Sequence, residues 1–285
     1  MKGETLVVGA TGRVGGIVFD LLETDGRKPI AMSHRPDVAR DRLPRVREGD
    51  MRRPETLPGA LDDIETAFLV TPLGPDETEA GLRFLDAAEE AGVAKIVYVA
   101  IMNIEAMRDI PHFATKIPVR ERLLAGQGHV VLDANFFMQN DLLAAPALKA
   151  GVYPLPIGST GVYSVDARDV GQAAFRAMTR SDWDGRAVPV CGSDRVTGPS
   201  AAELYARTAD RPFAYPGDAI DPFIEGIRHA MPMDEWIEND LRKMMQVTQR
   251  KGCPADAYAI EACTELLGRP PRRYEDFVRE TVAAL

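Results

Sequence analysis

The chain opens on an apolar run, a glycine-rich turn and an amphipathic stretch, a pattern that predicts a strand, a tight turn and a helix. Residues 6–8 (LVV) form the apolar run, as in a strand that is buried on both faces. In residues 17–22, apolar side chains recur at the spacing of one helical face. Residues 9–15 (GATGRVG) lie between them. This order is the context in which a glycine-rich turn binds a dinucleotide.

The same alternation of buried runs and amphipathic stretches continues to residue 135. Apolar runs predict strands at residues 28–33, 66–70, 95–100 and 130–134, and residues 46–48 can form a short strand after the first of these. Helical periodicity predicts helices near residues 54–60, 76–91 and 112–125. Strands that alternate with helices form a parallel sheet covered on both faces. We therefore expect an α/β fold with a doubly wound parallel sheet, the Rossmann architecture.

The pattern changes after Gln139. Residues 152–161 are rich in proline and glycine and predict a long loop that crosses the site. Beyond it we expect a short strand at 187–190 and helices near 166–178, 200–209, 222–229, 234–249, 255–267 and 274–284. Residues 1–150 are thus predicted to form an NAD(P)-binding domain, to which 160–192 return. The remainder of 151–285 is predicted to form a smaller, mostly helical lobe that binds substrate.

The glycine turn carries the expected phosphate chemistry. Gly9 permits the tight turn, Gly12 lets a diphosphate approach the backbone, and Gly15 lets the helix pack closely on the strand. The free N–H groups at the start of the helix favour an anion. The residues predicted to bind the diphosphate are Gly9, Thr11, Gly12, Arg13, Val14 and Gly15. The alternative is a strand-to-helix turn that needs glycine only for its own geometry.

Further candidates follow the ends of other strands, where ligands of such sheets bind. Arg35 comes just after the second strand, and its guanidinium suits the 2′-phosphate of NADP(H) better than the ribose hydroxyl of NAD(H); a solvated surface arginine is the alternative. Asp50 is predicted to accept from the adenine amino group or to cap the next turn. Thr71, Ala100 and Asn135 mark three more strand ends and are predicted to contact the cofactor.

Composition excludes several other classes of protein. The 285 residues are 45% hydrophobic and 27% charged, as in an ordinary globular protein, and the net charge of −9 argues against a broad nucleic-acid surface. The three cysteines and four histidines lack the spacing of a metal site. No apolar run reaches the ~18 residues of a membrane span, and no signal-like segment follows the start. We expect a cytoplasmic protein without metal or membrane partner.

Several segments together resemble the NmrA-like group, atypical members of the short-chain dehydrogenase/reductase superfamily. They are GATGRVG, KIVYVA, HFATKIPVRERLL, NFFMQN and the ending LLGRPPRRYEDFVRE. The resemblance implies an NAD(P)-binding Rossmann fold. Some members of the group reduce quinones, dyes or conjugated double bonds with NADPH, and others bind NADP as sensors. Typical members of the superfamily use Ser, Tyr and Lys together, but here no hydroxyl follows Val99, and His112 stands where tyrosine is usual, four residues before Lys116.

The resemblance implies that Lys116 contacts the nicotinamide ribose and polarises or protonates a substrate. His112 lies one helical turn earlier and is either a proton donor or a structural residue near the helix start. Asn135 and Phe136 are predicted to line the nicotinamide, although a phenylalanine at a strand end also suits the core. Met102, Met107, Met138, Tyr153 and Tyr163 are candidates for an apolar substrate pocket or for core packing.

Together these features predict an NADPH-dependent reductase that transfers hydride to a small apolar acceptor of the quinone, enone or imine type. The alternative is a non-catalytic NADP(H)-sensing regulator that binds a protein partner, which the missing serine and tyrosine favour. A homodimer is possible, and no nucleic-acid partner is expected.

Overall fold

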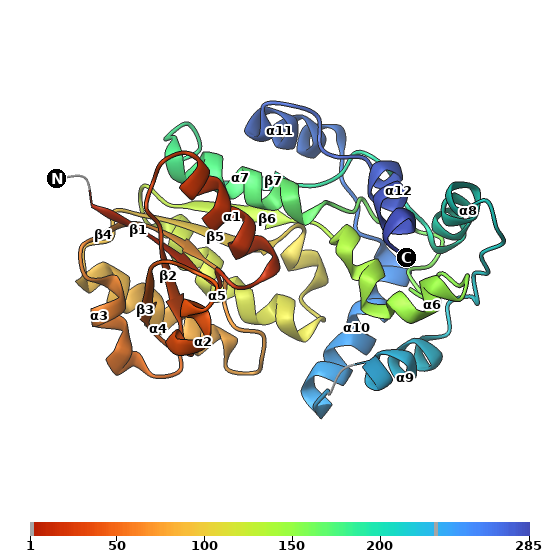
Figure 1. Cartoon of the computed structure of the whole chain (residues 1–285), viewed down its shortest axis with the longest axis horizontal. Helices are drawn as coiled ribbons and strands as arrows, with labels where there is room; N and C mark the ends of the chain where they lie inside the picture. The colour runs from red at the N-terminus through yellow and green to blue at the C-terminus, as the bar shows by residue number, and fades with distance from the viewer. Residues whose placement is uncertain (1–2, 231–232) are drawn as a thin grey trace. The chain divides into compact units, whose positions relative to one another are not determined.

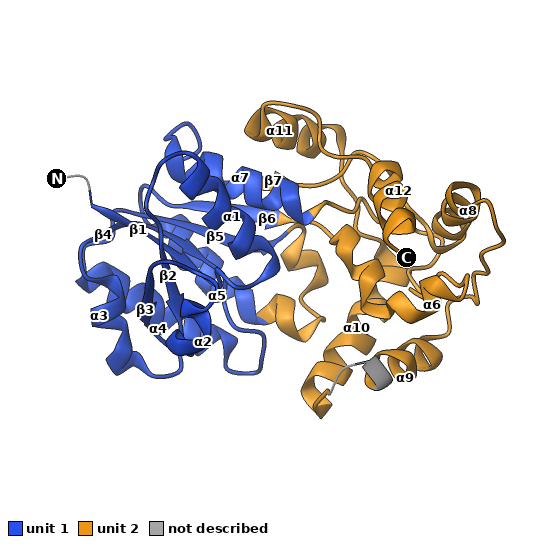
Figure 2. Cartoon of the chain, in the orientation of Figure 1, with its two compact units in different colours: residues 1–101, 115–133, 167–188 blue, residues 102–114, 134–166, 189–285 orange. Residues whose placement is uncertain are grey.

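The computed structural model describes residues 3–230 and 233–285, and the chain divides into two compact units (Figures 1 and 2). Unit 1 comprises residues 1–101, 115–133 and 167–188, and unit 2 comprises residues 102–114, 134–166 and 189–285. Residues 102–114 and 134–150, which the sequence-based division assigns to the nucleotide-binding domain, thus group with unit 2 by their contacts. The roles of the two parts stay predictions.

Seven strands form one sheet in the order β3-β2-β1-β4-β5-β6-β7. They are β1 (Glu4–Val8), β2 (Ile30–Ser33), β3 (Val46–Glu48), β4 (Ile64–Leu69), β5 (Lys95–Ile101), β6 (Val130–Ala134) and β7 (Arg186–Val190). The neighbours β3 and β2, β2 and β1, β1 and β4, and β4 and β5 are parallel. Because strand order reverses direction between β1 and β4, the sheet is doubly wound. This confirms the predicted Rossmann α/β fold.

The helices of unit 1 approach one another closely at glycines. α1 (Arg13–Thr24) packs on α7 (Ala167–Thr179), where a Cβ on Gly171 would lie 2.4 Å from Cγ2 of Ile17. Likewise a Cβ on Gly81 of α4 (Glu77–Glu90) would lie 2.6 Å from Cγ2 of Val119 in α5 (Pro111–Ala125). Any side chain at these two positions would push the helices apart. Unit 1 also contains α2 (Pro36–Arg40), η1 (Pro54–Thr56) and α3 (Leu57–Leu61).

Unit 2 is mostly helical, as predicted. Its described helices are η2 (Ile104–Met107), η3 (Met138–Ala144), α6 (Ala145–Lys149), α8 (Gly198–Ala209), α9 (Ile220–Ala230), α10 (Glu235–Lys251), α11 (Ala257–Leu267) and α12 (Tyr274–Ala284). The pattern of the sequence missed η2, η3 and α6, which are too short to show helical periodicity. None of the helices in the described part of the chain is long and apolar enough to span a membrane.

A buried carboxylate organises the core of unit 2. Asp141 of η3 accepts hydrogen bonds from the phenols of Tyr153 at 3.0 Å, Tyr205 at 3.0 Å and Tyr274 at 2.5 Å. Burial raises the pKa of Asp141 to about 6, although the three phenols favour its charged form. The three donors come from segments far apart in the sequence, so this carboxylate ties them together.

Candidate functional site

The turn between β1 and α1 has the geometry that its glycines predict. Gly9 has a φ of +71°, in the left-handed region that favours glycine. A Cβ on Gly15 would lie only 2.2 Å from the carbonyl oxygen of Gly9. No side chain caps the start of α1 at Gly12, and Thr11, Gly12 and Arg13 are exposed there. The turn therefore leaves the backbone at the helix start open to an anion.

A cavity of about 520 Å³ opens beside this turn, wholly within unit 1. Its walls come from the carboxyl ends of β1, β2, β3 and β4 and from the α2 segment. Among the predicted cofactor residues, it brings together Gly9, Thr11, Arg35, Asp50 and Thr71. The remaining lining residues are Val8, Met32, Ser33, His34, Val38, Ala39, Arg42, Gly49, Met51, Arg52, Val70 and Pro72.

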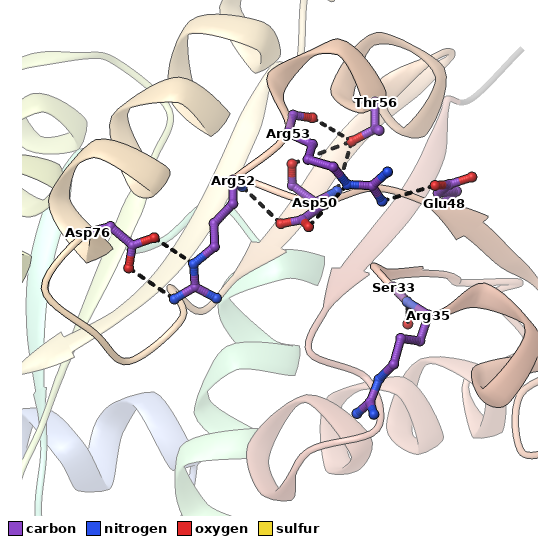
Figure 3. A network of polar contacts seen from close by, with 8 residues as sticks. All are labelled: Ser33, Arg35, Glu48, Asp50, Arg52, Arg53, Thr56 and Asp76. Carbon is purple, nitrogen blue, oxygen red and sulfur yellow. Dashed lines mark hydrogen bonds and ion pairs between the residues drawn. The ribbon is translucent and has the colours of Figure 1, made fainter. Parts of the chain in front are cut away.

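The arginines that line this cavity differ in their partners, and Figure 3 shows two of them, Arg35 and Arg52. Arg52 makes a two-pronged ion pair with Asp76, with N···O distances of 2.5 and 3.0 Å. The backbone N–H of Arg35 donates to Oγ of Ser33 at 3.1 Å. Within the described residues, the guanidinium groups of Arg35 and Arg42 have no hydrogen-bond or ion-pair partner, and both side chains are exposed. Two unpaired cations at one cavity favour a phosphate ligand.

Arg42 was absent from the sequence-based candidates. It follows α2, a five-residue helix that the sequence pattern did not predict. The presence of Arg42 at the same cavity as Arg35 could therefore not be anticipated.

Asp50 is engaged in its own turn. Its Oδ1 accepts from the backbone N–H of Arg52 at 2.9 Å, and its Oδ2 lies 3.4 Å from Nε of Arg53. The backbone N–H of Asp50 donates to Oγ1 of Thr56 at 2.9 Å. Figure 3 shows these contacts together. They favour turn capping, the second of the two roles predicted for Asp50, and the contact with adenine stays a prediction.

Lys116 lies in a buried polar cluster of unit 1. Its Nζ donates to Oε1 of Glu77 at 2.5 Å and to Oγ1 of Thr71 at 3.0 Å. Glu77 is fully buried and also accepts from the hydroxyls of Thr71 and Thr115, each at 2.5 Å. The phenol of Tyr98 lies 3.2 Å from Oγ1 of Thr71. Because Thr71 lines the cavity, the cluster connects Lys116 to the cavity wall through one hydroxyl.

The cluster fixes the charge of its members. Burial alone lowers the pKa of Lys116, but the neighbouring Tyr98 and Glu77 outweigh burial and raise it above its usual value. Burial raises the pKa of the Tyr98 phenol. Lys116 is therefore an ammonium ion and Tyr98 a neutral phenol near neutral pH. Sequence reasoning missed Glu77 and Tyr98, because an acid in the first helical turn is ordinary and a strand tyrosine usually packs in the core.

His112 is paired with an acid that sequence reasoning also missed. Oδ2 of Asp240 lies 2.6 Å from Nδ1 of His112, and Oδ1 accepts from the His112 backbone N–H at 2.8 Å. Both residues belong to unit 2, and Asp240, on α10, is only 3% exposed. A carboxylate accepts hydrogen bonds, so Nδ1 of His112 is the donor in this pair.

The other predicted nicotinamide contacts have structural partners. Nδ2 of Asn135 donates to the carbonyl oxygen of Cys253 at 3.2 Å, and Oδ1 of Asn135 accepts from the Phe136 backbone N–H at 2.7 Å. Ala100 is 1% exposed, belongs to the core of unit 1 and does not line the cavity. Val14 is half-buried on α1. The cofactor contacts of these residues stay predictions.

Packing explains part of the predicted substrate pocket, because Met107, Met138 and Tyr153 are buried in the core of unit 2. None of the three cysteines forms a disulfide, and all three are buried. Within the described residues, no group of three or more His, Cys, Asp or Glu side chains is arranged to hold a metal ion.

Comparison with known proteins identifies the family. The model of the NmrA-like family matches residues 1–277. The chain belongs to the NmrA-like family. It is 29% identical to the NAD(P)H azoreductase of Xenophilus azovorans over 98% of each chain. It is 31% identical to the (4-alkanoyl-5-oxo-2,5-dihydrofuran-3-yl)methyl phosphate reductase of Streptomyces griseus, again over 98% of each chain.

A solved structure agrees with the fold. The NADPH-dependent quinone oxidoreductase QOR2 of Escherichia coli, in complex with NADPH, superposes with a TM-score of 0.84 at 20% identity and covers 97% of this chain and 99% of its own. At this identity the likeness establishes the architecture of the NmrA-like fold for this chain.

Proposed function

We propose that this member of the NmrA-like family is an NADPH-dependent reductase that transfers hydride to a small apolar acceptor of the quinone, enone or imine type. Two relatives matched over almost the whole chain are named reductases, one of them an NAD(P)H azoreductase. The observation that carries the choice of NADPH is the cavity of unit 1, where Arg35 and Arg42 present unpaired guanidinium groups. A 2′-phosphate is the group that distinguishes NADPH from NADH, and it suits two such cations.

The residues of unit 1 fit a dinucleotide. The glycine turn leaves no space for a side chain at Gly15 and has an uncapped helix start at Gly12 for the diphosphate. Arg35 and Arg42 are the groups that would bind the 2′-phosphate. When bound, NADPH supplies the hydride and its two electrons, while the protein orients the reactants and manages charge and protons.

In this proposal, Lys116 stabilises negative charge on the acceptor. Its ammonium is held by Glu77 and donates to Thr71 on the cavity wall. A fixed positive charge next to the cavity stabilises negative charge that develops on an acceptor during hydride transfer. Because the Lys116 side chain is only 14% exposed, we infer that its ammonium acts mainly by its field and through Thr71.

Two observations support this acceptor class: an acid that the chain lacks, and the names of its relatives. No tyrosine stands four residues before Lys116, so the phenol acid of typical carbonyl reductases is missing. Quinones need less acid assistance than simple ketones, because the oxygens of the reduced product are weak bases that water can protonate. One relative is named for an azo acceptor and another for an unsaturated furanone phosphate. A regulator without turnover, the alternative, is not favoured by these relatives.

The experiment that tests the proposal compares wild type with Lys116→Met. Wild-type protein should oxidise NADPH faster than NADH, and only when a quinone, azo dye or enone is present. Lys116→Met should lower turnover by roughly 10²-fold and change NADPH affinity by less than about threefold. Tight NADPH binding without turnover on any acceptor would point to the regulator instead.

A cytoplasmic location and a homodimer stay predictions.

A further inference from the structure

The two-pronged ion pair between Arg52 and Asp76 joins two loops that begin at distant strands of the sheet (Figure 3). Arg52 follows β3 and Asp76 follows β4, and both β2 and β1 lie between those strands. At about 4.8 Å per neighbouring pair of strands, the ends of β3 and β4 are roughly 14 Å apart. Both loops line the cavity of unit 1, one through residues 49–52 and the other through residues 70–72. The pair therefore ties one wall of the cavity to another.

Asp76 forgoes the usual cap of a helix start to form this pair. It is the N-cap residue of α4, yet its side chain accepts no hydrogen bond from the start of that helix. An aspartate at this position ordinarily accepts from the backbone N–H two or three residues later. The N-cap Asp234 of α10 does so, from the N–H of Ile237 at 2.8 Å. Both carboxylate oxygens of Asp76 bind the guanidinium of Arg52 instead.

The loops on either side hold the two partners in place. Oδ1 of Asp50 accepts from the Arg52 backbone N–H at 2.9 Å, which fixes the turn that carries the guanidinium. On the other loop, a Cβ on Gly74 would lie 3.0 Å from Oδ1 of Asp76 and 3.2 Å from Nη2 of Arg52. A side chain at residue 74 would therefore crowd the ion pair. The glycine leaves room for the carboxylate and the guanidinium to meet.

We propose that Arg52 and Asp76 form a strap that positions the walls of the cofactor cavity and so determines how long a dinucleotide stays bound. The inference rests on the proposed function, because it takes NADPH as the ligand of this cavity. A wall that is held in place before binding loses less conformational freedom on binding, which favours slow release. Because the strap acts on the wall and not on the 2′-phosphate, it retains NADPH and NADH equally. Arg35, by contrast, is expected to discriminate between them.

A direct phosphate contact by Arg52 is the competing role, because Arg52 lines the same cavity as Arg35 and Arg42. The two roles make opposite predictions for Asp76→Asn, which removes the charge and keeps a residue that is favoured at an N-cap. If the strap holds the wall, this change loosens the wall and speeds release of the cofactor. If Arg52 binds a phosphate, the same change makes its guanidinium available and slows release.

The experiment measures the release of bound NADPH by stopped flow, with excess NADP⁺ as the chase and nicotinamide fluorescence as the signal. Arg52→Gln and Asp76→Asn should each raise the release rate roughly fivefold, as expected for loss of a well-aligned exposed ion pair, and leave the association rate within about twofold. The double variant should release NADPH within about twofold of either single variant, because both changes remove the same pair. The release of NADH should rise by the same factors.

Glu79→Gln is the matched control. It removes an exposed ion pair with Arg83 within α4, with an N···O distance of 3.5 Å, and should leave both release rates at the wild-type value. The melting temperature of each variant should lie within about 3 °C of wild type, because the pairs that are removed are exposed. A larger fall in melting temperature with unchanged release assigns Arg52 and Asp76 to stability and overturns the proposal.

The remaining outcomes separate the strap from the proposed function. Slower release from Asp76→Asn overturns the strap in favour of a phosphate contact by Arg52. Single effects that multiply in the double variant overturn it as well, because the two residues then act independently, and so does an increase confined to NADPH. If wild type binds neither cofactor, the proposed function fails and the strap with it. If wild type binds NADPH and no variant alters its release, only the strap fails.

Discussion

The buried ion pair between Glu77 and Lys116 gives a quantitative prediction for the free energy of unfolding of unit 1. Their charged atoms lie 2.5 Å apart, and Glu77 is fully buried. At an effective dielectric constant of about 20, two unit charges at this separation attract by roughly 6–7 kcal/mol, much of which is offset by lost hydration. Removing one partner leaves the other charge buried and unpaired. Glu77→Gln and Lys116→Met should therefore each lower the free energy of unfolding by about 3–5 kcal/mol.

The double variant Glu77→Gln/Lys116→Met removes both charges, so its loss should fall short of the summed single losses by about 1–3 kcal/mol. Urea unfolding in a Trp236→Phe background measures this, because the remaining tryptophan, Trp183, lies in unit 1. Glu79→Gln is the matched control: Glu79 lies on the same helix with 72% of its side chain exposed and should change stability by less than about 0.5 kcal/mol. Single losses below about 1 kcal/mol, or losses that add within about 0.5 kcal/mol, would refute this reasoning.

Three further predictions concern the cofactor site and unit 2. Arg35→Asp should weaken NADPH binding by at least about tenfold and leave NADH binding nearly unchanged. Titration of both cofactors checks this, with Arg40→Ala as control because Arg40 pairs with Asp37 and does not line the cavity; equal losses for both cofactors would contradict it. Gly15→Ala should lower NADPH affinity and stability more than Gly16→Ala, since the new Cβ would lie 2.2 Å rather than 3.3 Å from the nearest backbone oxygen. Melting curves with and without NADPH decide this, and similar effects of the two variants would count against the close approach. The pKa of Asp141 is raised from 3.8 to about 6, so the folded chain holds this proton more tightly than the unfolded chain. The associated stability is present below pH 4 and is lost as the pH rises to 6, by about 3 kcal/mol in all. Subtracting the stability of Asp141→Asn from that of wild type across this range should isolate the decline, and a flat difference would exclude it.

The parts of the molecule that depend on local pattern were predictable from the sequence. The run LVV, the turn GATGRVG and the helix after it correspond to β1, the Gly9 turn and α1. The convergence of Arg35, Asp50 and Thr71 on one cavity followed because parallel strands place their carboxyl ends at one edge. A strand assignment accurate to two or three residues was enough for this.

Partners separated by long stretches of chain were not predictable. Asp240 lies 128 residues after His112, and nothing in its helix distinguishes it from a solvated acid. Glu77 looks like an ordinary acid in the first turn of a helix, yet tertiary packing buries it against Lys116. Asn135 looked available for a cofactor until the carbonyl of Cys253, 118 residues later, was found to accept from its amide. A buried polar group needs partners, but a sequence does not say which ones.

The central claim, hydride transfer from NADPH, is tested most directly with NADPH deuterated at C4. Wild-type protein is mixed with each stereoisomer of the labelled cofactor and with a quinone, an azo dye or an enone, and single-turnover oxidation is followed at the reduced-nicotinamide absorbance band. We expect acceptor-dependent oxidation that is slowed severalfold by deuterium in one stereoisomer and not in the other. Tight NADPH binding with no oxidation on any acceptor would contradict it, as would oxidation with no isotope effect from either stereoisomer.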